Sequence, residues 1–423
     1  MSGVAGLLAA IADVGRDPRR GGVTRPVFSP AERTLREWFT AEAAARGLSV
    51  EPDGNGGLWA WWDLPPRAGR TTAQARRGAL VTGSHLDSVP GGGRFDGPLG
   101  VASALAAVSD LQAREAAGQL TRNRALAILV PAEEEGSRFG VACLGSRLMT
   151  GDLDPARALA LTDADGTTFA EALHAAGLDP ARAGRDPAAL DSIGDFVELH
   201  VEQGRNLAPL AEDAAPGPAV AVGSSILGHG RWRLSLHGQG NHAGTTLMED
   251  RADPMVAAAQ VVLAVRKAAG QVPDARATVG RLEPVPGGTN VIASRVDLWL
   301  DVRHPEDHVT AELVQRIHGQ AQKTAAFEGC TASLTEESST GTVQFDPVLA
   351  GMLTESLRRT VPDAPLLATG AGHDAGVLAR HKPAGMLFVR NPTGISHAPE
   401  EHVEDDDADT GAAALADALA DLL

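Results

Sequence analysis

The sequence predicts an α/β protein with a mixed central sheet flanked by helices, into which a smaller α+β domain is inserted. Two observations support this fold class. Short apolar runs end in small or glycine-rich turns and alternate with helical periodicity, which is typical of buried strands that present ligands at their carboxyl ends. Farther along the chain, apolar and polar side chains alternate, which is typical of half-exposed strands.

The larger domain is predicted mainly from the first part of the chain. Residues 79–84 (A-L-V-T-G-S) form an apolar run that ends in small residues, as expected of a buried strand entering a functional loop. The run at 124–131 leads directly into three glutamates. The predicted elements are helices over 1–48, with one break near Pro26 and Pro30, and over 98–117, and strands over 57–63, 79–84 and 124–131.

The inserted domain is predicted from a β-α-β-β-α pattern, which is typical of a small ferredoxin-like sandwich. Its elements are strands over 231–237 and 296–303 and helices over 253–270 and 306–327. A proline-rich linker at 208–222 and a return linker at 335–347 are expected to bound it. The expected domain ranges are therefore 1–210, 211–330 and 331–423, of which the first and last form the larger domain.

Composition limits the partners and the compartment. The 423 residues are 43% hydrophobic, enough for a sizeable core, and the formal net charge of −17 disfavours nucleic acid and anionic membrane surfaces as partners. Cys143 and Cys330 are the only cysteines, so no disulfide framework is expected, and a reducing, cytoplasmic compartment fits best. The N-terminal apolar run is short and has no basic residue before Arg16, which indicates an amphipathic helix rather than a signal peptide or a membrane span.

Four motifs carry residues of the kinds that bind metal ions. They are G-S-H-L-D-S-V-P-G-G-G-R-F-D-G-P at 83–98, E-E-E-G-S-R-F at 133–139, E-L-H-V-E-Q-G at 198–204 and G-I-S-H-A-P-E-E at 394–401. Each lies beside a strand-like run or a tight glycine turn. Because a pair of divalent ions that activates water needs imidazole and carboxylate ligands, a bridging carboxylate and a nearby base, these motifs together predict a dinuclear centre.

The first motif supplies three candidates. His85 offers a neutral imidazole, and Asp87 can accept the second N–H of that ring or orient the site from outside. Asp96 follows a glycine turn that can bend its carboxylate back towards His85, so it is the candidate bridge. Taken alone, both aspartates could simply cap turns, a common role for this residue.

Three adjacent glutamates at 133–135 would repel one another at a strand end unless cations neutralised them. Neighbouring side chains of an extended chain point in opposite directions, so one glutamate can bind metal while the next faces the substrate. We expect Glu135 to be a ligand, Glu134 the general base and Glu133 a solvated neighbour. The alternative is a charged helix N-terminus, which the helix dipole would favour.

His200 and His397 complete the set. His200 lies in an apolar alternation, where a histidine without function would be the default interpretation of that segment alone. His397 follows the turn N-P-T-G-I-S and precedes Ala-Pro, so a loop is expected to hold it rigidly. The joint occurrence of all four motifs favours metal binding over separate structural roles.

These motifs resemble the dinuclear-metal amidohydrolase and exopeptidase family that includes aminoacylases, carboxypeptidases, N-carbamoyl-L-amino acid hydrolases and allantoate amidohydrolases. The resemblance covers nearly the whole chain from about residue 30. It implies a metal-binding catalytic domain with an inserted lid and dimerisation domain, and two divalent ions (Zn²⁺ or Mn²⁺, with Co²⁺ as a further candidate). It further implies a cis peptide bond after the bridging aspartate, at Asp96–Gly97. The implied roles are metal ligation by His85, Asp96, Glu135, His200 and His397, catalysis by Glu134 and support by Asp87.

Further motifs resemble the carbamoylase and allantoate branch: G-N-H-A-G-T-T-L-M-E-D-R at 240–251, T-N-V-I-A at 289–293, D-V-R at 301–303 and G-A-G-H-D-A at 370–375. The resemblance implies that His242, Asn290 and Arg303 reach the substrate across a dimer interface, with Gly372 adding a backbone contact. Arg303 suits a substrate carboxylate and His242 a developing oxyanion. Taken singly, Arg303 could be a surface ion-pair partner, and His242 and Asn290 turn residues.

The chain departs from this branch at three positions. Leu247 and Ala293 stand where relatives usually have proline, which should affect only loop stiffness. His229 stands where relatives commonly have a substrate-contacting glutamine, so it is a candidate substrate-binding residue and bears on substrate choice.

The resulting prediction is a cytoplasmic, homodimeric hydrolase that cleaves a linear C–N bond, in a ureido or carbamoyl group of a small carboxylated substrate. Allantoate is the first choice and N-carbamoyl-L-amino acids the second. A dipeptidase, an aminoacylase of the same architecture and a silent ligand-binding relative are the remaining alternatives. A silent relative would be expected to lack one of the bridging or base acids, and this chain has all of them.

Overall fold

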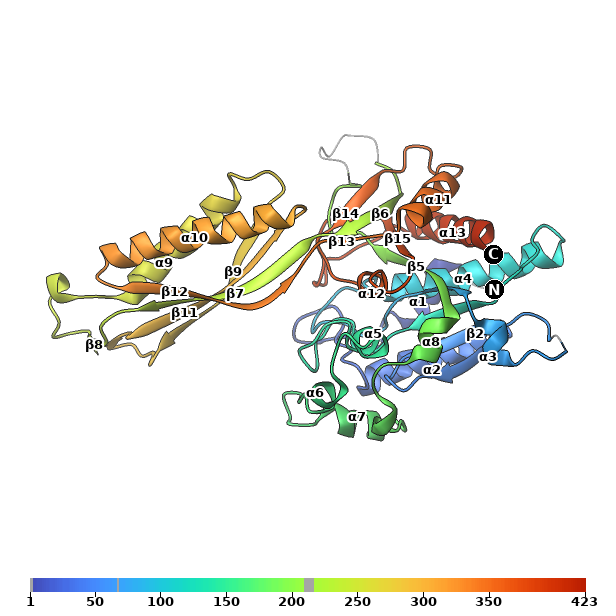
Figure 1. The fold of residues 1–423 in the computed structure, drawn as a ribbon, viewed down its shortest axis with the longest axis horizontal. Coiled ribbons are helices and arrows are strands. Elements are labelled where there is room, and N and C mark those ends of the chain that lie inside the picture. The colour runs from blue at the N-terminus through green and yellow to red at the C-terminus, as the bar shows by residue number, and fades with distance from the viewer. Residues whose placement is uncertain (1–2, 67, 209–216) are drawn as a thin grey trace. The chain divides into compact units, whose positions relative to one another are not determined.

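The structure is a computed structural model that describes residues 3–66, 68–208 and 217–423. The chain forms two compact units, one made of Met1–Ser224 and Gln344–Leu423 and the other of Ser225–Val343. Figure 1 shows the elements of each unit. The domain boundaries predicted from the sequence, at 211 and 331, both lie earlier in the chain than the boundaries between the two units.

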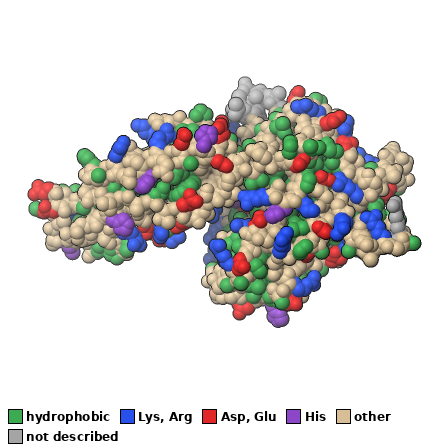
Figure 2. All heavy atoms as spheres, viewed as in Figure 1, with side chains coloured by type: hydrophobic (Ala, Val, Ile, Leu, Met, Phe, Trp, Pro, Cys, Tyr) green, Lys and Arg blue, Asp and Glu red, His purple; other side chains and the backbone are tan. Residues whose placement is uncertain are grey.

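Two features of the structure concern nucleic acid and membranes as partners: the charged side chains on the surface, and the length and hydropathy of the helices. Figure 2 shows acidic and basic side chains interspersed over the visible face of the protein. Of the helices within the described ranges, none is both long enough and apolar enough to cross a membrane.

A nine-stranded mixed sheet forms the centre of the larger unit (Figure 1), as the fold class predicted. Its order is β1-β2-β4-β3-β5-β15-β6-β13, and β14 also pairs with β6. The run β4-β3-β5-β15 is parallel, whereas β1–β2, β2–β4 and β15–β6 are antiparallel. The strands are β1 (Ser49–Pro52), β2 (Leu58–Trp62), β3 (Ala79–Gly83), β4 (Leu126–Val130), β5 (Ile193–Val201), β6 (Val220–Ile226), β13 (Val343–Gln344), β14 (Leu366–Thr369) and β15 (Ala384–Val389).

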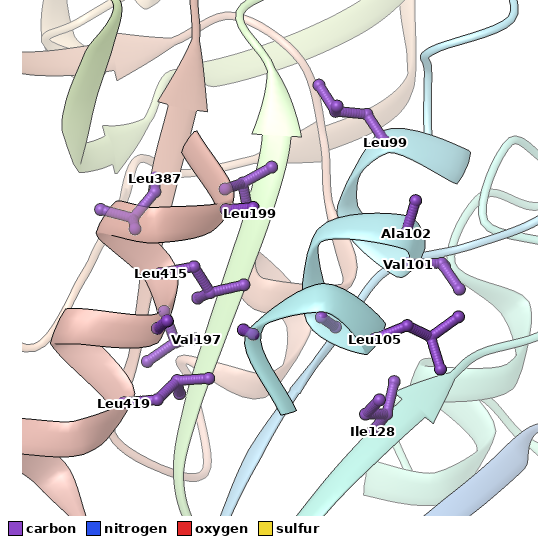
Figure 3. Close-up of a cluster of buried hydrophobic side chains, with 14 of the residues drawn as sticks. Leu99, Val101, Ala102, Leu105, Ile128, Val197, Leu199, Leu387, Leu415 and Leu419 are labelled. Atoms are coloured by element: carbon purple, nitrogen blue, oxygen red, sulfur yellow. The ribbon is translucent and has the colours of Figure 1, made fainter. Parts of the chain in front are cut away.

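Helices cover both faces of this sheet. Val197 and Leu199 of β5 pack with Leu105 of α4 and Leu415 of α13 in the main core, as Figure 3 shows. Successive strand residues point to opposite faces, and on the other face Glu198 accepts a hydrogen bond from the N–H of Ala375 in α12. The helices of this unit are α1 (Val4–Ile11), α2 (Pro30–Ala45), α3 (Thr72–Arg76), α4 (Pro98–Ala116), α5 (Leu144–Thr150), α6 (Pro155–Leu159), α7 (Phe169–Ala175), α8 (Pro187–Ser192), α11 (Pro347–Leu357), α12 (Asp374–Leu378) and α13 (Asp405–Leu422).

The N-terminal region is less helical than the sequence indicated. α1 ends at Ile11 and α2 begins only at Pro30, so the expected single break is in fact a long segment of turns. The buried Arg25 donates hydrogen bonds from Nε to the carbonyl oxygen of Val14 and from Nη2 to that of Ile11. A cation that caps carbonyls at a helix C-terminus favours ending the helix there, and alanine-rich composition alone does not reveal this contact.

The smaller unit contains a four-stranded antiparallel sheet in the order β12-β7-β11-β9, with the connectivity β-α-β-β-α-β. Residues of α9 and α10 pack against the sheet in a separate core that includes Val261, Leu298 and Ile317. The main elements are β7 (Gly228–His237), α9 (Pro254–Ala269), β9 (Arg276–Val285), β11 (Arg295–His304), α10 (Asp307–Phe327) and β12 (Thr331–Thr340), with a short pair formed by β8 (Asn241–His242) and β10 (Val291–Ile292).

The two expected linkers differ from the structure. The return linker predicted over 335–347 is wrong in part, because β12 continues to Thr340 and α11 already begins at Pro347. This exposed strand was not predicted because its sequence is rich in serine and threonine. Of the linker predicted over 208–222, residues 209–216 lie outside the described residues, and β6 begins at Val220.

Candidate metal centre

The residues singled out in the larger unit lie at the carboxyl ends of four neighbouring strands. His85 follows β3, the glutamates 133–135 follow β4, His200 is the penultimate residue of β5, and His397 lies in the loop after β15. Because the carboxyl ends of parallel strands share one edge of the sheet, the fold gathers motifs that are far apart in the sequence.

The first group consists of His85, Asp96 and His200, all buried. Oδ1 of Asp96 lies 3.3 Å from Nε2 of His85 and 3.2 Å from Nε2 of His200. The two Nε2 atoms are 3.4 Å apart. Three potential ligand atoms therefore converge on one point.

The backbone sets the orientation of both rings. Nδ1 of His85 is 3.0 Å from the carbonyl oxygen of Asp87, and Nδ1 of His200 is 2.9 Å from that of Val201. A carbonyl oxygen can only accept, so each Nδ1 carries the hydrogen and each Nε2 of a neutral ring keeps its lone pair for a cation. The sequence left two roles open for the Asp87 carboxylate; the structure shows that the backbone carbonyl of Asp87, not the carboxylate, accepts the ring N–H.

The second group consists of Asp96, Glu135 and His397. Nε2 of His397 lies 3.5 Å from Oδ2 of Asp96 and 3.3 Å from Oε2 of Glu135. Asp96 thus presents one oxygen to each group, which is the arrangement of a bridging carboxylate. His397 has φ 57° and its side chain is 50% exposed.

Gly97 is required next to this carboxylate. Its φ is 86°, and a Cβ there would lie 2.6 Å from ring atoms of His85, so a side chain would displace the ligand. The cis peptide bond expected at Asp96–Gly97 is not present. In the described part of the chain the cis bond is Val285–Pro286.

Asp87 and Glu133 brace the loop that carries the other glutamates. The carboxylate of Asp87 accepts the backbone N–H groups of Glu134 at 3.2 Å and Glu135 at 3.1 Å. Glu133 is fully buried and accepts the N–H groups of Arg138 at 2.8 Å and Phe139 at 2.6 Å. The prediction that Glu133 is solvated is therefore wrong. Its φ of 55° breaks the extended run on which that prediction depended.

Glu134, the predicted general base, lies beside the first group. Its Oε2 is 3.7 Å from Nε2 of His85, and its Oε1 is 3.7 Å from Sγ of the buried Cys143. Burial raises the pKa of Glu134 well above its usual value, and the repulsion from Glu135 adds to the shift. A carboxyl group whose pKa is raised holds a proton more readily than a free carboxyl group, which suits a group that takes up a proton and returns it.

The electrostatics of the cluster favour bound cations. Burial and the neighbouring Asp96 raise the pKa of Glu135 well above its usual value. Burial would raise the pKa of Asp96 as well, but His200 and His85 hold it well below its usual value. Within the described part of the chain, Oε1 of Glu135 is buried without a hydrogen-bond partner. Imidazole nitrogens and carboxylate oxygens are ligands that divalent zinc, manganese and cobalt accept, so the residues fit a pair of cations that share Asp96.

Sequence reasoning missed four polar residues around the centre. Gln203 donates from Nε2 to Oδ2 of Asp96 at 2.7 Å, and Glu401 accepts the backbone N–H of Asp96 at 3.0 Å. His373 and Asp374 are buried, and neither ring nitrogen of His373 has a hydrogen-bond partner among the described residues. All four lie within motifs that had been singled out for another residue, so their proximity in sequence was the available signal.

The candidate substrate residues of the smaller unit lie on or beside its strands. Arg303 forms a bidentate ion pair with Asp301, with Nε–Oδ1 2.7 Å and Nη2–Oδ2 2.9 Å. His229 is opposite Arg303 in the β7–β11 register, and burial together with Arg303 lowers its pKa. His242 is exposed, and its Nδ1 accepts the N–H of Gly244 at 3.1 Å, so in the neutral ring Nε2 carries the hydrogen.

The two remaining candidates are Asn290 and Gly372. The carbonyl oxygen of Asn290 accepts the N–H of Ala243 at 3.0 Å, which connects the two loops of the smaller unit. In the larger unit, Gly372 is exposed and directly precedes the buried His373.

The chain matches one protein family over most of its length. The sequence model of Peptidase family M20/M25/M40 matches residues 81–421. The chain is 35% identical to an N-carbamoyl-L-amino acid amidohydrolase from Geobacillus stearothermophilus, over 96% of this chain and 95% of that protein. It is 32% identical to an allantoate amidohydrolase from Bacillus subtilis (strain 168), over 94% and 92%.

A solved structure agrees with these sequence matches. The chain superimposes on an amidase of the hydantoinase/carbamoylase family from Burkholderia multivorans with a TM-score of 0.81 and 30% sequence identity. The superposition covers 99% of this chain and 96% of the other. The similarity therefore extends across the whole described fold and is not confined to the motifs.

Proposed function

The chain belongs to Peptidase family M20/M25/M40, and from this premise we propose that it is a metal-dependent amidohydrolase acting on a ureido or carbamoyl C–N bond of a small carboxylated molecule. Allantoate is the first candidate substrate. The observation that carries the proposal is Asp96, whose two carboxylate oxygens face two separate groups of potential metal ligands. The native metal is proposed to be Zn²⁺ or Mn²⁺, with Co²⁺ as a further candidate.

His85, Asp96 and His200 would hold one cation, and Asp96, Glu135 and His397 the other. When bound, the two cations supply Lewis-acid chemistry that makes water nucleophilic near neutral pH. Glu134 takes the proton from the attacking water at its carboxylate and returns it to the leaving nitrogen. Asp87 keeps Glu134 and Glu135 in place through their backbone N–H groups.

Substrate recognition is proposed to involve Arg303, His242, Asn290, His229 and Gly372. Arg303 carries a guanidinium group that would pair with a substrate carboxylate, and its ion pair with Asp301 fixes the orientation of that group. His242 can donate from Nε2 to an oxyanion because its Nδ1 already accepts the N–H of Gly244. Replacing Arg303 by Ala should raise KM for carboxylated substrates more than it lowers kcat; an unchanged KM would remove Arg303 from the site.

N-carbamoyl-L-amino acids are the second candidate substrates. The observation in their favour is the 35% identity to an N-carbamoyl-L-amino acid amidohydrolase, against 32% to an allantoate amidohydrolase. A dipeptidase or aminoacylase activity on the same fold is the less favoured alternative. His229, at a position where a glutamine is expected, bears on this choice.

One assay separates these possibilities. Metal-free protein would be supplied with Mn²⁺, Zn²⁺ or Co²⁺ and then incubated with allantoate, N-carbamoyl-L-amino acids or dipeptides while ammonia is measured. Ammonia from a ureido substrate only when metal is present would support the proposal. Release of amino acids from dipeptides, with no ammonia from either ureido substrate, would contradict it.

We propose in addition that the active protein is a cytoplasmic homodimer joined through the smaller unit, which would act as an inserted lid and dimerisation domain. Light scattering coupled to size-exclusion chromatography would measure the mass directly. A mass of 43.6 kDa in solution, that of one chain, would contradict the dimer.

A further inference from the structure

Glu401 is buried in the loop that also carries His397, and it contacts the loop that carries the bridging Asp96. Its Oε1 accepts hydrogen bonds from the backbone N–H groups of Phe95 and Asp96, both at 3.0 Å. Its Oε2 is 3.3 Å from the hydroxyl of Ser396, which is also 3.1 Å from Oδ2 of Asp96. With 4% exposure, this one carboxylate connects the backbone of the bridging ligand to the residue before His397.

The glycine-rich turn before Asp96 is built around this carboxylate. A Cβ at Gly93 would lie 2.1 Å from Oε1 of Glu401 and 2.3 Å from its Cδ. Any side chain at Gly93 would therefore push the carboxylate away from the N–H groups of Phe95 and Asp96. The close approach explains why glycine is needed at this position of the G-G-G run and shows that both segments fit together around Glu401.

From these contacts we infer that Glu401 is a positioning residue that holds the Asp96 loop against the His397 loop and thereby maintains the second cation group. The role rests on the proposed function, because it concerns the binding of two cations. Glu401 touches neither the cations nor the substrate in this role. It acts through the backbone of Asp96 and through Ser396.

Loss of Glu401 should weaken mainly the cation group formed by Asp96, Glu135 and His397. His85 and His200 are fully buried, and each is oriented by a backbone carbonyl near the end of its strand. His397 instead lies in a loop, is half exposed, and is preceded by the residue that contacts Glu401. Loss of Glu401 therefore frees the backbone of the shared Asp96, but the first group keeps the two carbonyl contacts that orient its rings, whereas the second group also loses the contact beside His397.

The test is isothermal titration of Mn²⁺ into metal-free protein, combined with metal analysis after dialysis. Wild type is expected to bind two ions per chain. Glu401→Ala should weaken the second ion by about 10- to 100-fold, the usual cost of losing an outer partner of a metal ligand, and change the first much less. After dialysis it should retain one ion, as His397→Ala should. Glu401→Gln keeps an acceptor oxygen and should lose less.

The neighbouring Glu400 provides a matched control, because it is exposed and its replacement by Ala removes the same charge one residue away. Glu400→Ala should bind two ions like wild type. Binding by Glu401→Ala that equals wild type, or an equal loss of both ions, would overturn the positioning role. Wild type that binds no Mn²⁺, Zn²⁺ or Co²⁺ would instead overturn the proposed function itself.

A second variant covers the case in which Glu401→Ala does not fold, as judged by circular dichroism. Ser396→Ala removes only the hydroxyl between Glu401 and Asp96. It should weaken the second ion alone by about 2- to 10-fold, the range expected for one hydrogen bond. Unchanged binding of the second ion by this folded variant would contradict the role.

Discussion

The two halves of the candidate centre use the same ligand chemistry but are supported differently. His85 and His200 lie next to or within buried parallel strands, and a backbone carbonyl orients each ring. Glu135 and His397 lie in loops and depend on carboxylates, Asp87 for one and Glu401 for the other. Regular backbone positions the first pair directly, whereas the second pair needs polar residues that bind no cation. The difference suggests a tightly held first ion and a more readily exchanged second ion.

The largest expected effect comes from removing a ligand of the strand-supported group. His200→Ala should lose the first ion, and because Asp96 is shared, the second ion should weaken too. Loss of several kcal/mol of transition-state stabilisation corresponds to a rate decrease of about a thousand-fold or more. His397→Ala should instead retain one ion per chain. Metal analysis and kcat measured for both variants would test this, and equal metal contents would contradict the unequal support.

Glu134→Gln should separate catalysis from metal binding. Glu134 lies beside the first group but belongs to neither, so both ions should remain while kcat falls by about 10²- to 10⁴-fold, the usual contribution of a general base. Loss of an ion from this variant would mean that Glu134 is a ligand rather than the base. Glu134 would then have to be counted among the ligands of the centre.

Asp87→Ala should have the next largest effect, and that effect should fall on the group that contains Glu135 and His397. Its carboxylate holds the backbone of Glu134 and Glu135, whereas its backbone carbonyl, which the substitution keeps, orients His85. Activity should therefore fall by about 10- to 100-fold, with a weaker second ion and little change in the first. A selective loss of the first ion would show that the side chain, not the carbonyl, supports His85.

Much of the fold could be predicted from the sequence because apolar periodicity determines which elements are buried. The α/β class with its mixed sheet is confirmed, and α4 begins at Pro98 as expected. Residues next to buried strands, such as His85 and His200, could be singled out because strand ends of an α/β sheet share one edge. The resemblance to the family is confirmed as well.

The supporting residues could not be predicted in this way. Glu401 contacts Asp96 across 305 positions in the sequence, and its place in the motif around His397 does not show which residue it contacts. The side chain of Glu133 turns inward because its φ is 55°, a conformation that three consecutive glutamates do not indicate. Arg25 ends α1 through contacts made after the chain has folded back. In each case tertiary contacts, rather than local propensity, decide the outcome.

The smallest expected effect concerns how Glu133 supports the glutamate loop. Burial and the nearby Asp87 raise the pKa of Glu133 from 4.5 to about 8. Between these values the folded protein keeps a proton that the unfolded chain releases, so this group makes stability fall as the pH rises through that window.

Glu133→Gln keeps an oxygen that can accept the N–H groups of Arg138 and Phe139 but cannot ionise. The melting temperature of metal-free wild type should therefore fall more steeply between pH 5 and pH 8 than that of the variant, by about 1–2 °C for each kcal/mol at this chain length. Because the other titrating groups are present in both proteins, the difference between the two curves reports the Glu133 carboxyl group together with its effect on the neighbouring Asp87. Parallel curves would show that its carboxyl group does not change its ionisation on folding.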